Sequence, residues 1–172
     1  AANTTASNNV GIGKDALAVN TTGHQNVAVG VSAFDASTTS ANCVAIGHNA
    51  LTSQTAANDN VAVGKDSLQS NTTGAGNTAV GKDSLESNTT GGNVTSLGQT
   101  AGSTNTTGDN NIYVGVYAGA YGTGVTTGTR NNFIGNHTVS ASNSSNDQNV
   151  FGNNVTGIAN SFTFGTGGSD TT

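Results

Sequence analysis

Residues 60–76 read NVAVGKDSLQSNTTGAG, and residues 77–92 repeat them almost unchanged as NTAVGKDSLESNTTGG. Two near-copies side by side indicate an array of structural repeats rather than one irregular domain. The clearest marker of the repeat is the glycine that ends each VAVG or TAVG segment. It is Gly64 in one copy and Gly81 in the next, a step of 17. These two copies set the frame in which the rest of the chain is placed.

The marker glycine continues in both directions along the chain. Steps of 17 lead from Gly64 back to Gly13 and forward to Gly115, and the later steps are 20, 17 and 13. Each step predicts one coil of a solenoid. The structural repeat glycines are Gly13, Gly30, Gly47, Gly64, Gly81, Gly98, Gly115, Gly135 and Gly152, and Gly165 closes the series.

The three residues before each repeat glycine have the composition of a short β-strand. Apolar residues, mostly Val or Ile, stand one and three positions before the glycine, and small residues stand two positions before it. Because side chains alternate along a strand, the two kinds of residue lie on opposite faces. We expect the Val and Ile columns, with Val63 and Val80 among them, to face the core.

The residues after each glycine complete the coil. A large apolar residue four positions after it, such as Leu68, is expected on a second short strand that points into the same interior. The Asn-Thr-Thr-Gly segments that follow are expected to be turns, because Asn and Gly accept positive φ. So short a step leaves no room for two helices, and β-branched residues fill the strand positions. The fold class is therefore all-β: a parallel β-solenoid, or β-roll, of 17-residue coils.

Such a roll has little core of its own, because each coil buries only a few large side chains and gains more only from its neighbours. Side-by-side assembly would supply the missing burial. Small residues let another chain approach closely, so we expect the seam of a homotrimer along the Ala column; the alternative is that this column faces solvent. The residues of the expected seam are Ala28, Ala45, Ala62 and Ala79.

Composition excludes several functions. The 172 residues carry a formal net charge of −5 and only four Lys or Arg, which argues against binding to nucleic acid or acidic lipid. No apolar run is long enough for membrane insertion, and any targeting signal is expected outside this sequence. The single Cys43 cannot form an internal disulfide.

The chain divides into four parts by pattern. Residues 1–8 are a polar lead-in, 9–125 are regular repeats, 126–165 are degenerate repeats or a cap, and 166–172 are a flexible Gly/Ser/Thr tail. Toward the third part the Ala column becomes bulky, with Tyr113 and Phe133 in it. We interpret this as a change of packing or as the start of a cap.

The repeat motif resembles a known pattern. N-x-A-[VI]-G with a small residue three positions later is similar to the YadA-like head repeats of trimeric autotransporter adhesins. The longer forms NTAVGKDSLESNTTG and DNNIYVGVYAG resemble more closely the repeats of phage tail fibres. The resemblance, over about residues 9–165, implies a left-handed β-roll trimer, intertwined or side by side, in an extracellular or virion fibre that attaches to a host. The implied partners are copies of the chain and a host cell-surface glycan or protein.

Catalytic, metal and cofactor sites are not expected. Most acidic residues fall in turn positions, and no Ser-His-Asp group emerges from the repeat frame, so we do not expect an enzyme. The recurrent Lys-Asp pairs are expected to be solvated ion pairs rather than Ca²⁺ ladders. His24, His48 and His137 stand at different offsets in the repeat, which leaves only a metal on a trimer axis open.

A column of threonines suggests a different class of function. Regular Thr ladders on a flat solenoid can order water, as in ice-binding proteins, but this column lies inside the Asn-Thr-Thr-Gly turns. We therefore expect its hydroxyls to satisfy the backbone. The column comprises Thr21, Thr38, Thr55, Thr72, Thr89 and Thr106.

All three tyrosines fall in the coil where the step of the glycine series lengthens, between Gly115 and Gly135 or just before it. Tyr113 stands in the strand and is expected to fill the core. Tyr117 and Tyr121 follow the glycine in turn positions, where exposure is expected. Because Tyr is a common anchor at interfaces, we predict that Tyr117 and Tyr121 border a receptor-contacting patch.

Overall fold

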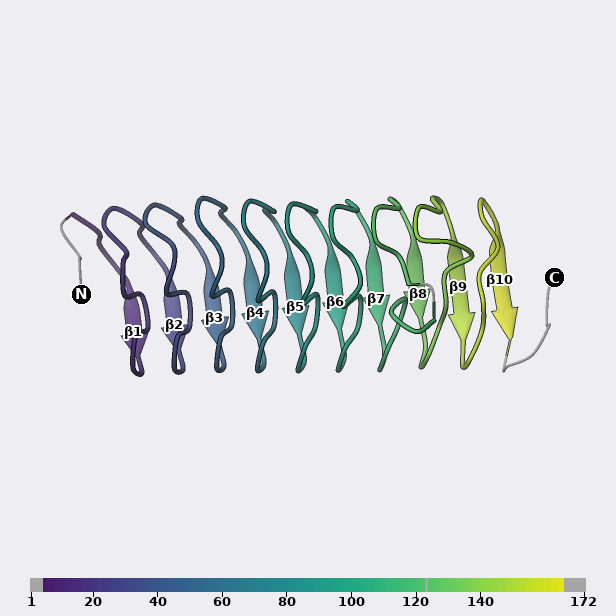
Figure 1. The fold of residues 1–172 in the computed structure, drawn as a ribbon, viewed down its shortest axis with the longest axis horizontal. Coiled ribbons are helices and arrows are strands. Elements are labelled where there is room, and N and C mark those ends of the chain that lie inside the picture. Colours follow the sequence, from purple (N-terminus) through teal and green to yellow (C-terminus); the bar gives the residue numbers. More distant parts are fainter. Residues whose placement is uncertain (1–4, 123, 166–172) are drawn as a thin grey trace.

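The computed structural model describes residues 5–122 and 124–165, and within them the protein is one parallel β-roll without a helix (Figure 1). Ten short strands stand side by side in a single sheet, in the same order as in the sequence. Most of the predicted lead-in, residues 1–4, and the predicted tail, residues 166–172, lie outside the described residues. The strands are β1 (Val10–Ile12), β2 (Val27–Val29), β3 (Val44–Ile46), β4 (Val61–Val63), β5 (Thr78–Val80), β6 (Thr95–Leu97), β7 (Ile112–Val114), β8 (Asn132–Ile134), β9 (Asn149–Gly152) and β10 (Phe162–Gly165).

The register of the sheet follows the glycine series. Val61 pairs with Thr78 across the 17-residue step, and Ile112 pairs with Asn132 across the 20-residue step. The 13-residue step aligns Gly152 with Gly165. The predicted parallel solenoid is confirmed, and β8, β9 and β10 extend the same sheet through the degenerate repeats.

Apart from one parallel bridge between Val139 and Thr156, the second strand of each coil is absent from the described residues, which corrects the prediction. The residues after each glycine form turns, with Asp66 at φ 56° and Leu68 at φ 50°, and the same two positions are left-handed in most coils. Bulky residues rarely adopt this conformation. The stack compensates, because Leu68 donates its N–H to the Ser84 carbonyl of the next coil at 3.0 Å and its side chain is fully buried.

The two faces of the sheet are reversed relative to the prediction. Ala28, Ala45, Ala62 and Ala79 are all completely buried, so they line the core of the single chain and cannot form a seam between chains. Val63 and Val80 point outward and stay partly exposed. The reason is the width of the coil: a Cβ added at Gly11, in the Ala column, would lie 3.5 Å from Leu17 Cδ1, so one small residue and one Leu already fill the interior.

The core changes its composition at β7 but keeps its volume. Tyr113 takes the place of the alanine, is completely buried and stacks on Phe133 with ring centroids 5.7 Å apart. The facing Leu position becomes glycine in the same coils, as Gly102 and Gly119, and a Cβ at Gly119 would lie 2.4 Å from the Tyr113 ring. The prediction that Tyr113 fills the core is confirmed, and burial raises the pKa of its phenol.

Buried amides form a second part of the core. The Asn60 Oδ1 accepts the N–H of Asn77 at 2.8 Å, and its Nδ2 donates to the Gly74 carbonyl at 2.8 Å. The turn asparagines make a parallel ladder, in which Asn88 donates to Asn71 at 3.0 Å and Asn105 donates to Asn88 at 2.8 Å. These asparagines thus cap the turns from the inside and link successive coils.

Replacing one rung of this ladder tests its contribution to stability. Asn88→Leu removes the donors to Asn71 and to the Gly91 carbonyl and leaves the Asn105 amide without its Asn88 acceptor. We expect the free energy of unfolding to fall by about 2–3 kcal/mol, because buried polar groups then lack hydrogen-bond partners. Thermal melting followed by circular dichroism measures it, with the exposed Thr90→Ala as control. Equal melting points for the two variants would contradict a structural role for the ladder.

Candidate functional surfaces

The outward side chains of the ten strands form one long, mostly apolar strip, which we call the outer face; the column one position before each glycine is apolar throughout, and Thr78, Thr95, Asn132 and Asn149 interrupt the other column. The outer face consists of the residues one and three positions before each repeat glycine and is about 43 Å long, from nine steps of ~4.8 Å. None of these residues carries a charge, and several are substantially exposed, with Ile12 at 60%. Its apolar members are Val10, Ile12, Val27, Val29, Val44, Ile46, Val61, Val63, Val80, Leu97, Ile112, Val114, Ile134, Phe151, Phe162 and Phe164.

The C-terminal end of the outer face is aromatic. The ring centroids of Phe151, Phe162 and Phe164 lie 4.7–5.5 Å apart, and Phe162 and Phe164 are 50% and 51% exposed. Next to them Asn132 donates to Asn149 at 2.7 Å, a polar interruption that is internally satisfied. Soluble monomers rarely expose apolar areas of this length, so the outer face indicates an interaction surface.

A second surface runs along the edge of the roll where the strands end. We call it the ridge; it consists of the residues one and two positions after each repeat glycine. In its N-terminal half these include Lys-Asp pairs, and the Lys14 ammonium lies 2.5 Å from the Asp15 carboxylate. Asp66 accepts hydrogen bonds from Lys65 and, at 3.0 Å, from Asn49. Burial raises the pKa of Asp66, but these hydrogen bonds and the nearby charge of Lys65 together outweigh it and hold that pKa below its ordinary value.

The predicted pairing is confirmed, since each of the Lys-Asp carboxylates is bonded to the lysine before it, but Asp66 is buried rather than solvated. The histidines lie apart from one another on separate coils. His48 Nδ1 lies 3.8 Å from Asp66, and His137 lies far along the ridge. In residues 5–122 and 124–165, no group of three His, Cys, Asp or Glu side chains could hold a metal ion.

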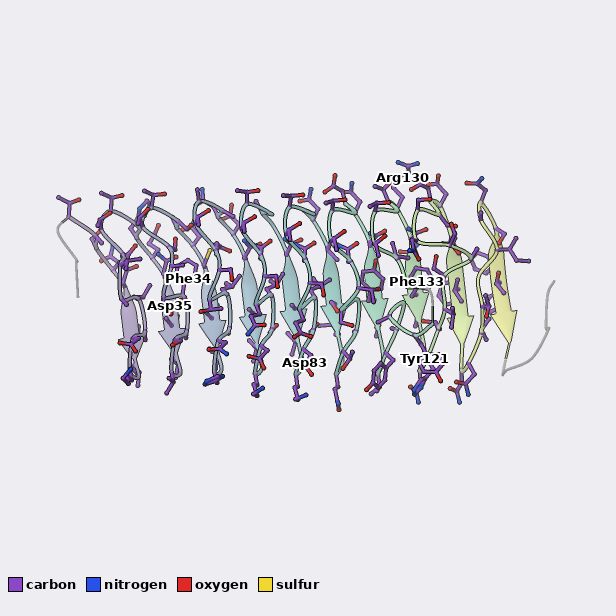
Figure 2. All side chains as sticks on the ribbon, viewed as in Figure 1. Phe34, Asp35, Asp83, Tyr121, Arg130 and Phe133 are labelled. Carbon is purple, nitrogen blue, oxygen red and sulfur yellow. The ribbon has the colours of Figure 1, made fainter. Side chains whose placement is uncertain are left out.

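Three rings gather at the C-terminal half of the ridge, two of them on it and the third, Tyr121, beside it. Tyr117 and His137 occupy the same position in successive coils and stack with centroids 5.0 Å apart. Tyr121 crosses both at steep angles, 76° to Tyr117 and 80° to His137, with centroids 6.4 and 4.8 Å away. Figure 2 shows Tyr121 on the same edge of the roll as Asp83, and Arg130 on the opposite edge. We call Tyr117, Tyr121 and His137 the aromatic cluster.

The structure brings together the two tyrosines that the sequence singled out. Tyr121 is 53% exposed, as predicted, whereas Tyr117, also expected to be exposed, is half-buried. Sequence reasoning missed His137. The register contained the signal, because His137 follows Gly135 by two positions just as Tyr117 follows Gly115.

The threonine column is engaged with the backbone. Thr72 Oγ1 donates to the Thr89 carbonyl and Thr89 Oγ1 to the Thr106 carbonyl, each at 2.9 Å. Thr106 continues the series by donating to Thr126 at 2.8 Å. The interpretation as turn chemistry is thus confirmed, because these hydroxyls donate their protons to the next coil.

No protein-family model, curated protein or solved structure matches this chain. The part of the chain that the structure describes has no pocket, and none of its segments is a helix that could cross a membrane. Cys43 is buried, with the Gln54 amide 3.3 Å from its Sγ.

Proposed function

We propose that the chain is a structural and adhesive fibre segment, a self-associating β-roll that attaches to a host or other surface. The observation that carries the proposal is the outer face, an uncharged apolar strip that runs the whole length of a straight, regular stack (Figure 1). Stacked repeats give length and stiffness, since each coil contacts only its neighbours. A strip of this kind is suited to lateral assembly into a fibre.

A second copy of the same chain is the occupant that fits the outer face best. Its own strip has the same length, the same step from strand to strand and the same lack of charge, so the two strips can be covered along their whole extent. The resemblance to tail-fibre repeats favours three copies, in a phage tail fibre or spike. The N-x-A-[VI]-G motif also fits an alternative, in which the chain is part of the head of a trimeric autotransporter-type adhesin with the same architecture.

The attachment role rests on the aromatic cluster. A regular shaft repeats one turn many times, whereas specific recognition needs an irregular surface with anchor side chains. The 20-residue coil supplies such a surface through Tyr117 and Tyr121. In this proposal the fibre is extracellular or part of a virion, and the cluster meets a host cell-surface glycan or protein.

Val63→Asp tests the assembly. Val63 lies at the middle of the outer face, so the substitution places a charge in the proposed seam and not in the core of the roll. We expect sedimentation equilibrium to give a trimer for the wild type and a smaller species for the variant, because an unpaired charge is costly to bury. Circular dichroism should still show the β-roll.

Thr90→Asp is the matched control, because it adds the same charge at an exposed turn. It should remain a trimer. A monomeric wild type, or a Val63→Asp variant of unchanged mass, would overturn the assembly through the outer face.

A further inference from the structure

We infer that the aromatic cluster, together with the amides beside it on the ridge, binds a neutral saccharide. The inference rests on the proposed attachment function and names the class of ligand for it. Three features of the ridge carry it: the arrangement of the rings, the absence of fixed charge and the rigidity of the backbone that holds the rings.

The rings form a corner rather than a flat stack. Tyr117 and His137 are nearly parallel, with an interplanar angle of 25°, and Tyr121 stands steeply against both. The electron-rich faces of aromatic rings attract C–H groups, and a phenol adds a polar tip. A pyranose has an apolar C–H face and a rim of hydroxyls, so it can lie against one ring of the corner while its hydroxyls reach polar groups nearby.

The ridge around the cluster is polar but carries no fixed charge. From Gly98 onward its positions hold no Lys, Arg, Asp or Glu, whereas the coil just before has Lys82 and Asp83. Amides donate and accept hydrogen bonds, as sugar hydroxyls do. The residues of this half of the ridge are Gln99, Thr100, Val116, Tyr117, Asn136, His137, Asn153 and Asn154.

The absence of Lys and Arg from this half of the ridge favours a neutral ligand over an acidic one. Arg130 lies on the opposite edge of the roll and is paired with Asp147 through two hydrogen bonds of 2.7 and 2.8 Å (Figure 2). A sialic acid, a uronic acid or a nucleic acid would therefore meet no lysine or arginine at the cluster, where the titratable nitrogens are those of the His137 imidazole. A neutral hexose or N-acetylhexosamine has no charge to pair, so its binding does not require a lysine or arginine at the cluster.

The backbone holds Tyr117 and His137 in place before any ligand arrives. Tyr117 and His137 both have positive φ, 56° and 53°, and their N–H groups donate to Gln99 and Val116 of the preceding coil at 3.0 and 2.9 Å. Tyr121 sits in the lengthened coil, where Gly124 donates to its carbonyl at 3.4 Å. Such preorganisation lowers the entropic cost of binding. Several copies in one fibre would add their weak sites together.

The test starts with an array of neutral hexose and N-acetylhexosamine oligosaccharides, with sialylated, uronic-acid and sulfated oligosaccharides on the same surface. We expect binding to neutral members without preference for acidic ones. The neutral oligosaccharide that binds best is then titrated while tyrosine fluorescence is recorded. The chain has no Trp, and two of its three tyrosines belong to the cluster, so the signal reports the site itself.

Tyr121→Ala should weaken binding about tenfold, the loss expected for one aromatic contact. Tyr121→Phe keeps the ring and should stay within about twofold of the wild type. Lys82→Ala, on the charged half of the ridge, should bind like the wild type. All three variants should keep the oligomeric mass and the melting point of the wild type, because Tyr121 and Lys82 are both exposed and lie outside the outer face.

The inference would be overturned by no binding to any neutral oligosaccharide, by a preference for acidic ones, or by unchanged affinity in Tyr121→Ala. Binding of a protein partner at the cluster, independent of glycans, would also overturn it. An oligomeric wild type that binds no saccharide would refute the inference and leave the assembly standing. A monomer that binds through Tyr121 would refute the assembly and leave the inference standing.

Discussion

Ala62→Asp is expected to destroy the folded roll, whereas Val63→Asp, one position further on, is expected to leave it folded. Ala62 is completely buried between Ala45 and Ala79 in the stack, and it belongs to the apolar core. A carboxylate there has neither room nor a partner. Buried unpaired charges belong to the small group of changes that cost about 4 kcal/mol or more.

Circular dichroism spectra and thermal melting curves of the two variants show whether each one still folds and how stable it is. Ala62→Asp should lose the β signal or melt far below the wild type, and Val63→Asp should retain the signal while losing only assembly. Ala62→Ser serves as the control, because Ser96 occupies the same column and bonds to the Ala101 carbonyl at 2.9 Å. The reverse order of damage would restore the interpretation in which Val63 faces the core.

The repeat period was sufficient to predict the strands and their register but not which face lies inside. The alternation of side chains along the strand places Ala62 and Val63 on opposite faces, but it does not say which of the two faces points into the core. The deciding quantity is the width of the coil, which depends on how Leu68 packs after the turn. One hint was present in the sequence: where Tyr113 enlarges the Ala column, Gly102 and Gly119 replace the leucine. Two columns that exchange volume in this way share one core.

The turn that carries Leu68 could not be predicted from residue preferences. Leucine disfavours positive φ, so its presence suggested a strand. The stack imposes the conformation, because each such residue donates its N–H to the next coil and buries its side chain against the Ala column. Repetition supplies the constraint that the isolated segment lacks.

The candidate sites were predictable to different degrees. Tyr117 and Tyr121 stood out because they share an irregular coil, and His137 could be placed beside them only through the register. The outer face was visible as Val and Ile columns but was assigned to the wrong side. The buried asparagines were interpreted only as turn formers, since an amide ladder inside a thin core requires the coil dimensions to be known.

Gly64→Ala is expected to be nearly as damaging as Ala62→Asp, for a reason that lies in the backbone. Gly64 has φ 137°, a conformation that side chains rarely adopt, and a Cβ there would lie 2.4 Å from the Gly81 carbonyl oxygen of the next coil. The atom that it meets is backbone, held in the sheet by the N–H of Gly81 donating to Val63 at 2.8 Å. The coils would have to separate, which we expect to cost about 3 kcal/mol or more.

Gly11→Ala is the matched control, because Gly11 stands in the Ala column and has ordinary space for a methyl group, 3.5 Å from Leu17 Cδ1. Its melting point should equal or exceed that of the wild type, since alanine restricts the unfolded chain. Denaturant or thermal melting of both variants separates the two roles of glycine. If Gly64→Ala had the same melting temperature as the wild type, successive coils would not approach as closely at the strand ends as described. The explanation of why each strand ends in glycine would then fail as well.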